Sequence, residues 1–332
     1  MIIAFSSCLT RHLSAVIVKY VVTLSSRLRM TIGNLPESDA PAPLDDDVRA
    51  RMSKVLGHRQ FDCFRVGGVQ SLNNDVRLLV TADGQRLAVR LASARGRNHL
   101  GVDPLEEGAI ASLAGVAGIG PRVVHAGTDG LLVTEWINGA RPLAADGFAD
   151  ALRRRAVIDL VRRLHELDLP SGPGPARSIF ERIAALEASA LAAGRAGMPE
   201  RHRQKLTRLK ASAQSSQRPT HHDLWPNNVL DDGERLWLVD WEFSGCGDGV
   251  YDLACIAVSA GLDPDEERAM LVQAGRPSGD HDWLSAMKWV ARYFEASWGL
   301  VMAGLGASAT DGTGQAFDYG AHAARMIARL DD

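Results

Sequence analysis

The chain has 332 residues, of which 46% are hydrophobic and 23% charged, and its formal net charge at pH 7 is −3. This composition is that of an ordinary globular protein and argues against disorder, while the length allows one large domain or two lobes around a shared cleft. The slightly acidic balance gives no electrostatic reason to expect nucleic acid or an anionic membrane as a standing partner, so an anionic cofactor needs a local basic site.

Four cysteines, Cys8, Cys63, Cys246 and Cys255, lie far apart in the chain and form no CxxC pair. This spacing suggests neither a disulfide framework nor a zinc site. We therefore expect reduced, mostly buried thiols and a cytoplasmic location.

The first thirty residues differ from the rest, because they contain no Asp or Glu and carry basic side chains among serines and aliphatic residues. The pattern resembles a targeting peptide or a membrane-surface helix. Arg11 and Lys19 interrupt the apolar stretches before they reach the length that spans a membrane, so we expect no stable membrane insertion. We favour translation from Met30, since the stretch at 31–47 is typical of a polar, mobile N-terminus. Residues 1–46 are thus predicted to be a disordered leader or not to be translated.

Residues 47–138 have the pattern of a small, sheet-rich lobe. Two β-rich stretches, 76–81 and 86–92, flank an Asp-Gly turn, which is a strong signal for a hairpin. Residues 104–114 are predicted to be helical, with a proline in the first turn and two acids near the N-terminal end. A short apolar strand is predicted at 131–137.

Residues 139–332 are predicted to form a larger, mainly helical lobe. Apolar residues recur at helical spacing in four stretches, at 149–167, 179–193, 266–274 and 283–304. Two short segments between these helices, 220–230 and 236–241, are predicted to be extended. A sheet lobe joined to a helical lobe leaves a cleft, where ligands bind preferentially.

The polar residues with the clearest chemical pattern lie in those two extended segments. Asp223 is followed five positions later by Asn228, and Asp240 ends the next strand. Phosphoryl transfer needs a carboxylate that orients the attacking hydroxyl and oxygen ligands that hold magnesium against the phosphates. Either half of the pattern alone is weak, because Asp and Asn are common in turns and caps, but the two together are much more specific.

The string H-x-D-x4-N that begins at His221, followed by D-W-E from Asp240, resembles the catalytic signature of the aminoglycoside phosphotransferase and choline kinase superfamily. Residues 243–254 are similar to the corresponding segment of bacterial choline kinase-like and thiamine kinase-like enzymes. The resemblance extends over roughly residues 61–298.

This resemblance implies an α+β, protein-kinase-like two-lobed fold with a small antiparallel-sheet N-lobe and a larger helical C-lobe. It also implies ATP and Mg²⁺ as cofactors. Residues 47–138 would bind the nucleotide, and residues 139–332 would carry the catalytic and acceptor sites. By position, Asp223 would be the catalytic base, and Asn228 and Asp240 would be the magnesium ligands.

A glycine-bearing loop between two strand-like segments resembles the phosphate-covering loop of the superfamily. Its candidate contacts are Gly68, Ser71 and Asn73. Glycine lets backbone N–H groups come close to phosphate oxygens. The loop is not GxGxxG, and such a hairpin taken alone is more often only a turn.

Further nucleotide contacts are expected from the strands of the N-lobe and from its helix. Arg90 stands where many kinases have Lys, and its guanidinium suits phosphate. Glu107, in preference to Glu106, would orient Arg90, although both acids could instead complement the helix dipole. Glu135 and Ile137 lie in a segment that resembles the hinge whose backbone reads adenine.

The acceptor side is predicted to contain an acid and aromatic rings, which suit a cationic substrate. Glu242 is the candidate acid, and the candidate walls are Trp225, Tyr293 and Trp298; aromatic residues on a helix are at least as often part of the core. The expected acceptor is a small alcohol, in particular an amino-alcohol such as choline or ethanolamine. Thiamine, an aminoglycoside, or a nucleotide-binding pseudokinase scaffold are the alternatives.

Three polar residues near this motif are expected to have structural roles. Asp252 is expected to cap the following helix, and Asp248 to brace the loop before it. His165 is expected to be a packing and hydrogen-bonding residue.

Overall fold

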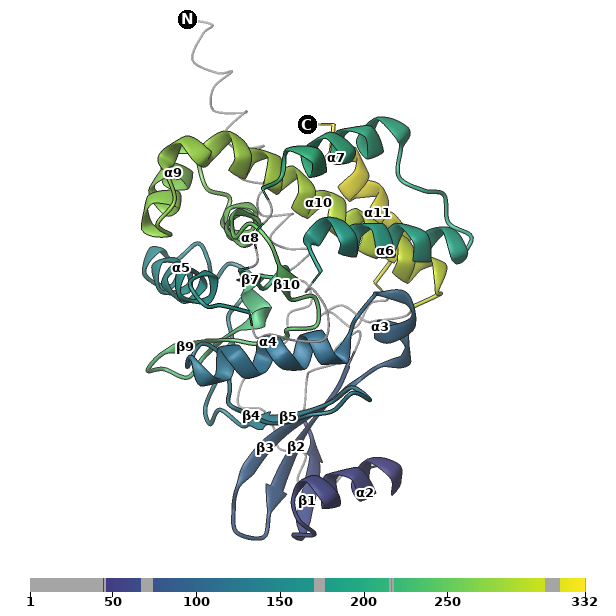
Figure 1. The fold of residues 1–332 in the computed structure, drawn as a ribbon, viewed down its shortest axis with the longest axis vertical. Helices are drawn as coiled ribbons and strands as arrows, with labels where there is room; N and C mark the ends of the chain where they lie inside the picture. The colour runs from purple at the N-terminus through teal and green to yellow at the C-terminus, as the bar shows by residue number, and fades with distance from the viewer. Residues whose placement is uncertain are drawn as a thin grey trace, which may run out of the picture.

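The computed structural model describes residues 44, 46–66, 74–169, 177–214, 216, 218–307 and 317–331. Figure 1 shows a small sheet at one end of the long axis and a larger group of helices at the other. The α+β architecture with a small antiparallel-sheet lobe and a helical lobe is confirmed. The exact boundary between the lobes, at 138/139, stays a prediction.

The sheet of the N-lobe is antiparallel, in the order β1-β2-β3-β5-β4. The hairpin predicted from the Asp-Gly turn is confirmed, and Gly84 in that turn has a φ of 82°, which glycine adopts without steric cost. The strand predicted at 131–137 ends earlier, at Glu135. The strands are β1 (Phe61–Arg65), β2 (Asn74–Thr81), β3 (Arg86–Ala92), β4 (Val123–Ala126) and β5 (Leu131–Glu135).

The core of the N-lobe forms where α2 (Asp46–Val55) covers one face of this sheet. Leu87 and Val89 are two positions apart on β3, so their side chains share a face, and Val133 of β5 joins them there. Met52 of α2 packs into the same cluster and is fully buried. The alternation of buried residues therefore sets which face of the sheet is covered.

The helix α4 (Pro104–Val116) lies between the sheet and the helical lobe (Figure 1). Asp103 caps its N-terminus by accepting a hydrogen bond of 3.0 Å from the N–H of Leu105, and proline occupies the first turn. The predicted helix is thus confirmed and is two residues longer than expected. The preceding short helix, α3 (Ala94–His99), was not predicted.

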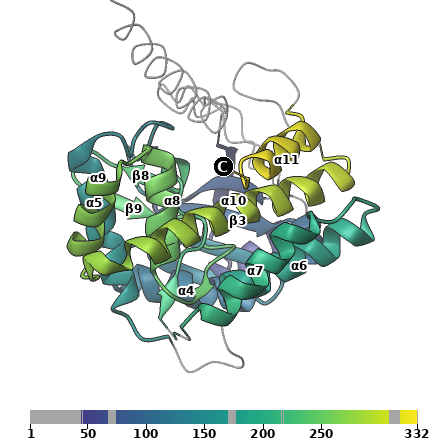
Figure 2. The ribbon, with the colours of Figure 1, turned by 90° about the horizontal axis from the view of Figure 1, so that it is seen from above.

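The helical lobe is built around α10, which contacts α6, α8 and α11 (Figure 2). Val290, Phe294 and Val301 of α10 lie in its core. None of the helices in the described ranges is long and apolar enough to cross a membrane. The helices of this lobe are α5 (Ala151–His165), α6 (Ile179–Ala192), α7 (Glu200–Ser212), α8 (Val250–Ala260), α9 (Pro264–Gln273), α10 (His281–Gly304) and α11 (Tyr319–Ala328), with 3-10 turns η1 (Pro226–Asn228) and η2 (Ser278–Asp280).

Short strands hold the loops that carry the predicted catalytic residues. They are β6 (Arg141–Pro142), β7 (Pro219–Thr220), β8 (Val229–Asp231), β9 (Leu236–Leu238) and β10 (Gly245–Cys246), paired as β6-β8-β9 and β7-β10. The prediction of a continuous extended segment at 220–230 was wrong. Only its ends are strands, because the chain between them turns through η1, where Pro226 occupies the first position.

Candidate active site

The loop that follows β7 is fixed by a buried carboxylate of α8. Asp252 accepts a hydrogen bond of 2.9 Å from the N–H of His221 and another of 2.9 Å from the N–H of His222. His165 Nε2 lies 2.8 Å from the same carboxylate. The expectation that Asp252 caps its helix was wrong, since α8 begins at Val250, after Gly249, and the carboxylate points to the loop. The backbone just before Asp223 is thus held at two consecutive residues.

The charge of Asp252 is retained despite its burial. Burial by itself raises the pKa of this carboxyl, but its interactions, first of all the hydrogen bond with His165, outweigh it and lower the pKa to about 2. An ionised carboxylate that accepts several N–H groups is favoured in this way. His165 thus has the hydrogen-bonding role expected of it, with Asp252 as its partner.

Both loop histidines are held as neutral rings by their hydrogen bonds. His222 Nδ1 lies 3.2 Å from the carbonyl oxygen of Phe243 and therefore carries the proton, while Nε2 accepts from the hydroxyl of Thr220 at 2.6 Å. His221 Nε2 likewise donates to the carbonyl of Val239 at 3.0 Å. Burial removes the ring from water and disfavours its protonated form, which lowers the pKa of His222 to about 3.

This buried histidine predicts an acid-sensitive fold. The pKa of His222 is about 3 in the folded protein against 6.5 for a free histidine, so its contribution to stability is full above pH 6.5 and is lost as the pH falls towards 3. The unfolding midpoint should therefore fall steadily from pH 7 to pH 4.5. In His222→Asn, whose side chain tolerates the positive φ of 62° found here, the decline over the same range should be shallower. Equal slopes in calorimetric scans of the two proteins would contradict this account.

The predicted catalytic residue Asp223 and the predicted metal ligand Asn228 lie side by side. Asn228 Nδ2 donates to the carbonyl oxygen and to Oδ2 of Asp223, both at 2.8 Å. Burial raises the pKa of Asp223 well above its usual range, and the charges of Asp240, Glu295 and Glu242 raise it further. A carboxylate with a raised pKa is suited to accept a proton.

Asp240, the second predicted metal ligand, has an unusual backbone and an unsatisfied oxygen. Its φ is 66°, a left-handed conformation that is uncommon for residues other than glycine and concentrates at functional sites. Its Oδ1 is buried and accepts no hydrogen bond, although it lies 3.2 Å from Arg90. A magnesium ion would supply the partner that this oxygen lacks.

The donor set also suits magnesium. Among the described residues no three His, Cys, Asp or Glu side chains gather as a metal cluster. Magnesium, however, is usually bound by one or two protein oxygens and completes its shell with phosphates and water. Asn228 and Asp240 can supply those protein oxygens.

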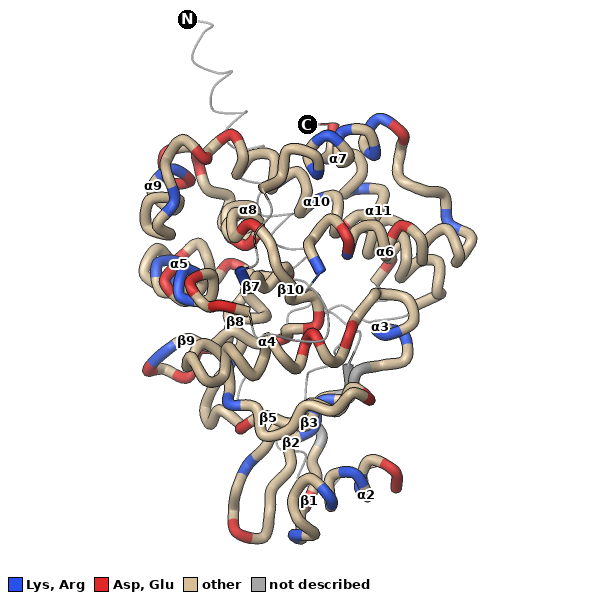
Figure 3. Tube along the Cα trace, in the orientation of Figure 1, with Lys and Arg blue, Asp and Glu red and all other residues tan. Residues whose placement is uncertain are grey.

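Arg90 joins the lobes through three carboxylates. Its guanidinium pairs with Glu107 of α4, lies 2.9 Å from Glu242 and 3.2 Å from Asp240. One cation thus faces three anions, and the surplus of negative charge would be offset by a bound divalent cation. Figure 3 shows acidic residues of α4 and of the neighbouring segment where the two lobes meet.

The structure gives Glu242 a different position from the one predicted. Its side chain is only 4% exposed and is engaged with Arg90, so it does not present its carboxylate to an acceptor. Glu107, in contrast, lies against Arg90 as predicted. The nearness of Glu242 to the predicted metal ligand in the sequence does not determine the direction of its side chain.

The remaining nucleotide contacts are placed only in part. The Glu135 side chain turns outward to Arg122 at 2.8 Å, so only the backbone of Glu135 and Ile137, at the end of β5, is left for a hinge role, which stays a prediction. Gly68, Ser71 and Asn73 lie outside the described residues.

The predicted aromatic walls separate into different environments. Tyr293 is fully buried, and its hydroxyl donates to Glu187 at 2.5 Å, so it belongs to the core. Trp298 is partly exposed and packs edge-on against Tyr319 of α11, with ring centroids 5.4 Å apart. Trp225 is partly buried within the catalytic loop itself.

Three residues in the neighbourhood of Trp298 were missed by the sequence analysis. Glu295 is one turn before Trp298 on α10, and its charge acts on Asp223. His322 of α11 lies 3.4 Å from Glu295, and its ring centroid is 6.2 Å from that of Trp298. Tyr319 has a buried hydroxyl without a hydrogen-bond partner. The sequence could have suggested only that Glu295 and Trp298 lie on one face of a helix. The residues of α11 reach them through tertiary packing of α11 on α10, which leaves no signal in the local sequence.

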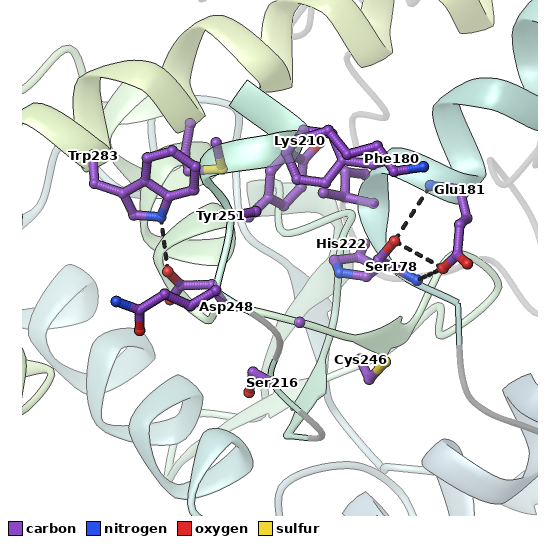
Figure 4. Close-up of a pocket in the computed structure, with 15 residues that line it drawn as sticks. Ser178, Phe180, Glu181, Lys210, Ser216, His222, Cys246, Asp248, Tyr251 and Trp283 are labelled. Atoms are coloured by element: carbon purple, nitrogen blue, oxygen red, sulfur yellow. Dashed lines mark hydrogen bonds between the residues drawn. The ribbon is translucent and has the colours of Figure 1, made fainter. Parts of the chain in front are cut away.

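A separate cavity of about 290 Å³ lies beside the loop that follows β7 and is lined by residues of α6, α7, α8 and α10 (Figure 4). The ring of His222 forms part of its wall, but the predicted catalytic and metal residues do not line it. Two polar side chains of its lining are already paired with each other, since Trp283 Nε1 donates to Asp248 at 2.7 Å. This cavity is therefore distinct from the site built around Asp223.

Comparison with solved structures defines the class of fold. The choline kinase LicA of Streptococcus pneumoniae superposes with a TM-score of 0.64 at 18% identity, covering 86% of this chain and 97% of that one. The ethanolamine kinase Pv091845 of Plasmodium vivax gives a TM-score of 0.65 at 12% identity, covering 92% and 96%. A choline/ethanolamine kinase family protein of Mesorhizobium loti gives 0.62 at 21%, covering 86% and 93%. At these identities the likeness shows a shared protein-kinase-like fold.

The sequence itself identifies the family. Residues 68–287 match the profile of the phosphotransferase enzyme family, and this chain belongs to that family. The protein LicA of Haemophilus influenzae is 44% identical over 48 residues, which are 14% of this chain and 18% of that protein. The chain thus matches less than a fifth of the length of this curated relative.

Proposed function

We propose that the protein transfers the γ-phosphate of ATP, with magnesium, to the hydroxyl of a small cationic amino-alcohol such as choline or ethanolamine. The observation that carries the proposal is the arrangement of Asp223, Asn228 and Asp240 beside the Arg90 cluster. It combines a carboxylate of raised pKa with two oxygen ligands and a cation anchored between the lobes.

The residues of the chain have separate tasks in this reaction. Asp223 orients the acceptor hydroxyl and takes up its proton, as its raised pKa allows. Asn228 and Asp240 hold magnesium, which when bound neutralises charge on the phosphates. Arg90 is kept in place by Glu107, so that the positive charge lies at the phosphate side of the cleft.

The charge near Asp223 supports a cationic acceptor. Glu295 contributes negative charge near Asp223, and Trp298, one turn later on α10, packs against Tyr319. A carboxylate and aromatic faces recognise ammonium groups. Two structural neighbours are described as a choline kinase and an ethanolamine kinase, which supports the same class of acceptor.

The direct test is ADP release from Mg·ATP by the purified full chain. The panel contains choline, ethanolamine, thiamine, an aminoglycoside and a simple sugar, with Asp223→Ala as the blank. A signal that requires an amino-alcohol and disappears in the variant is expected. Binding of ATP without turnover of any acceptor would favour the pseudokinase alternative, and absence of ATP binding would overturn the proposal.

Glu295 gives a test of the acceptor side alone. Glu295→Gln should raise KM for the cationic acceptor about tenfold and leave KM for ATP nearly unchanged, because it removes the negative charge that we assign to recognition of the acceptor cation. Steady-state kinetics with each substrate varied in turn would measure the two effects. Glu166→Gln, which removes an exposed carboxylate that pairs with Arg162 on α5, is the matched control. Equal changes in both KM values would exclude Glu295 from acceptor recognition.

A further inference from the structure

Two neighbouring acids of α4 face different lobes. Residues that follow each other on a helix point about 100° apart. Glu107 therefore reaches Arg90 on the sheet, while Glu106 turns to the helical lobe. There Glu106 lies 3.0 Å from Arg182 and 3.2 Å from Arg177.

Arg182 connects α4 to the segment that follows the predicted metal ligand. It is on α6, is only 2% exposed, and donates to the carbonyl oxygen of Ser244, four residues after Asp240. Burial lowers the pKa of Arg182 to about 10, which still leaves it charged at neutral pH. Its Nε and Nη1 have no hydrogen-bond partner. The Glu106 carboxylate is thus the ion-pair partner of a deeply buried cation.

Arg177 reinforces the same junction. Its backbone carbonyl accepts from the N–H of Cys246 at 3.1 Å, and its side chain donates to the carbonyl of Gly101 at 2.8 Å. It also pairs with Asp103, the N-cap of α4, at 3.1 Å. The start of α4, the start of α6 and the strand β10 are therefore joined at one place, which Figure 1 shows between the lobes.

We infer that Glu106 and Arg182 are positioning residues, whose ion pair keeps α4 against the helical lobe so that Glu107 holds Arg90 at the nucleotide site. The inference rests on the proposed function. The junction couples the N-lobe cation to the segment after Asp240, so that the phosphate-binding parts of both lobes are assembled together. A residue with only a structural role would lower stability without acting through Glu107.

A double-mutant cycle on Mg·ATP affinity tests this. In the wild-type background Glu106→Gln should weaken binding about tenfold, the size of a typical coupling through packed elements. In a Glu107→Gln background the same change should weaken binding less than about twofold, because the path through Glu107 is already broken. Titration calorimetry measures all four affinities, and Glu166→Gln serves as the carboxylate control.

The outcomes separate the possible roles. A tenfold loss in both backgrounds, or a loss no larger than in the control, would overturn the positioning role while leaving the proposed function intact. Failure of the wild-type protein to bind Mg·ATP would overturn the proposed function itself. If Glu106→Gln does not fold, Glu106→Asp, which keeps the charge and shortens the reach, carries the test with an expected loss of about threefold.

Discussion

Asp223→Asn is expected to lower kcat by about 10²- to 10⁴-fold, the range contributed by a positioned general base. The change removes the group that takes the proton and keeps the size of the side chain. Affinity for Mg·ATP should stay within about twofold, since Asp223 is not among the proposed metal ligands. Rapid-quench kinetics with the best acceptor and calorimetry with Mg·ATP would measure the two quantities.

The thermal stability of the same variant provides the control. Burial raises the pKa of Asp223, and the charges of Asp240, Glu295 and Glu242 raise it further. Removal of its charge should therefore leave the unfolding midpoint unchanged or raise it. A variant that is at least as stable as the wild type and yet inactive would assign the loss to chemistry. A kcat within tenfold of the wild type would remove Asp223 from its role.

Asp240→Asn is expected to have opposite effects on nucleotide binding with and without magnesium. With magnesium, affinity for ATP should fall about 10²-fold, because a charged metal ligand is lost. Without magnesium, affinity should be unchanged or higher, because one of the anions that repel the phosphates is gone. Asn tolerates the φ of 66° found at this position, so the backbone should be preserved.

Calorimetry in excess Mg²⁺ and in excess EDTA measures both arms of this second experiment. An equal loss of ATP affinity in the two conditions would indicate that the substitution has damaged the loop, and not that it has removed a metal ligand. Unchanged affinity in the presence of magnesium would refute the assignment of Asp240. Arg90 is a neighbour of Asp240 at 3.2 Å, so the unfolding midpoint should be measured alongside.

Much of the fold follows from local sequence signals. The hairpin of β2 and β3 was evident from its turn, and α4 from its proline and the two acids in its first turn. The helix α7 was missed because it is mostly exposed and polar, with His202 as its only buried residue. The helix α11 near the C-terminus was missed as well, since it is short and gains its burial from α10.

The proximity of candidate site residues was predictable where chemistry constrains their order in the sequence. Asp223, Asn228 and Asp240 came from a motif, and the structure brings Asn228 next to Asp223. Side-chain direction was not predictable, which is why Glu242 and Tyr293 were assigned to the acceptor although one pairs with Arg90 and the other is in the core. Long-range contacts, such as the hydrogen bond from the N–H of His221 to Asp252 of α8, leave no signal in the local sequence.

The left-handed backbone at His222 and Asp240 has a consequence for how this protein could be stabilised. Each non-glycine residue in that conformation costs roughly 1–2 kcal/mol, in a protein whose whole stability is of the order of 5–15 kcal/mol. Selection for heat resistance alone would therefore favour relaxation of these two positions, as it would at the third such residue, His58. Any lineage or laboratory selection that rewards turnover must keep the strain, and must gain thermostability at sites distant from the catalytic loop.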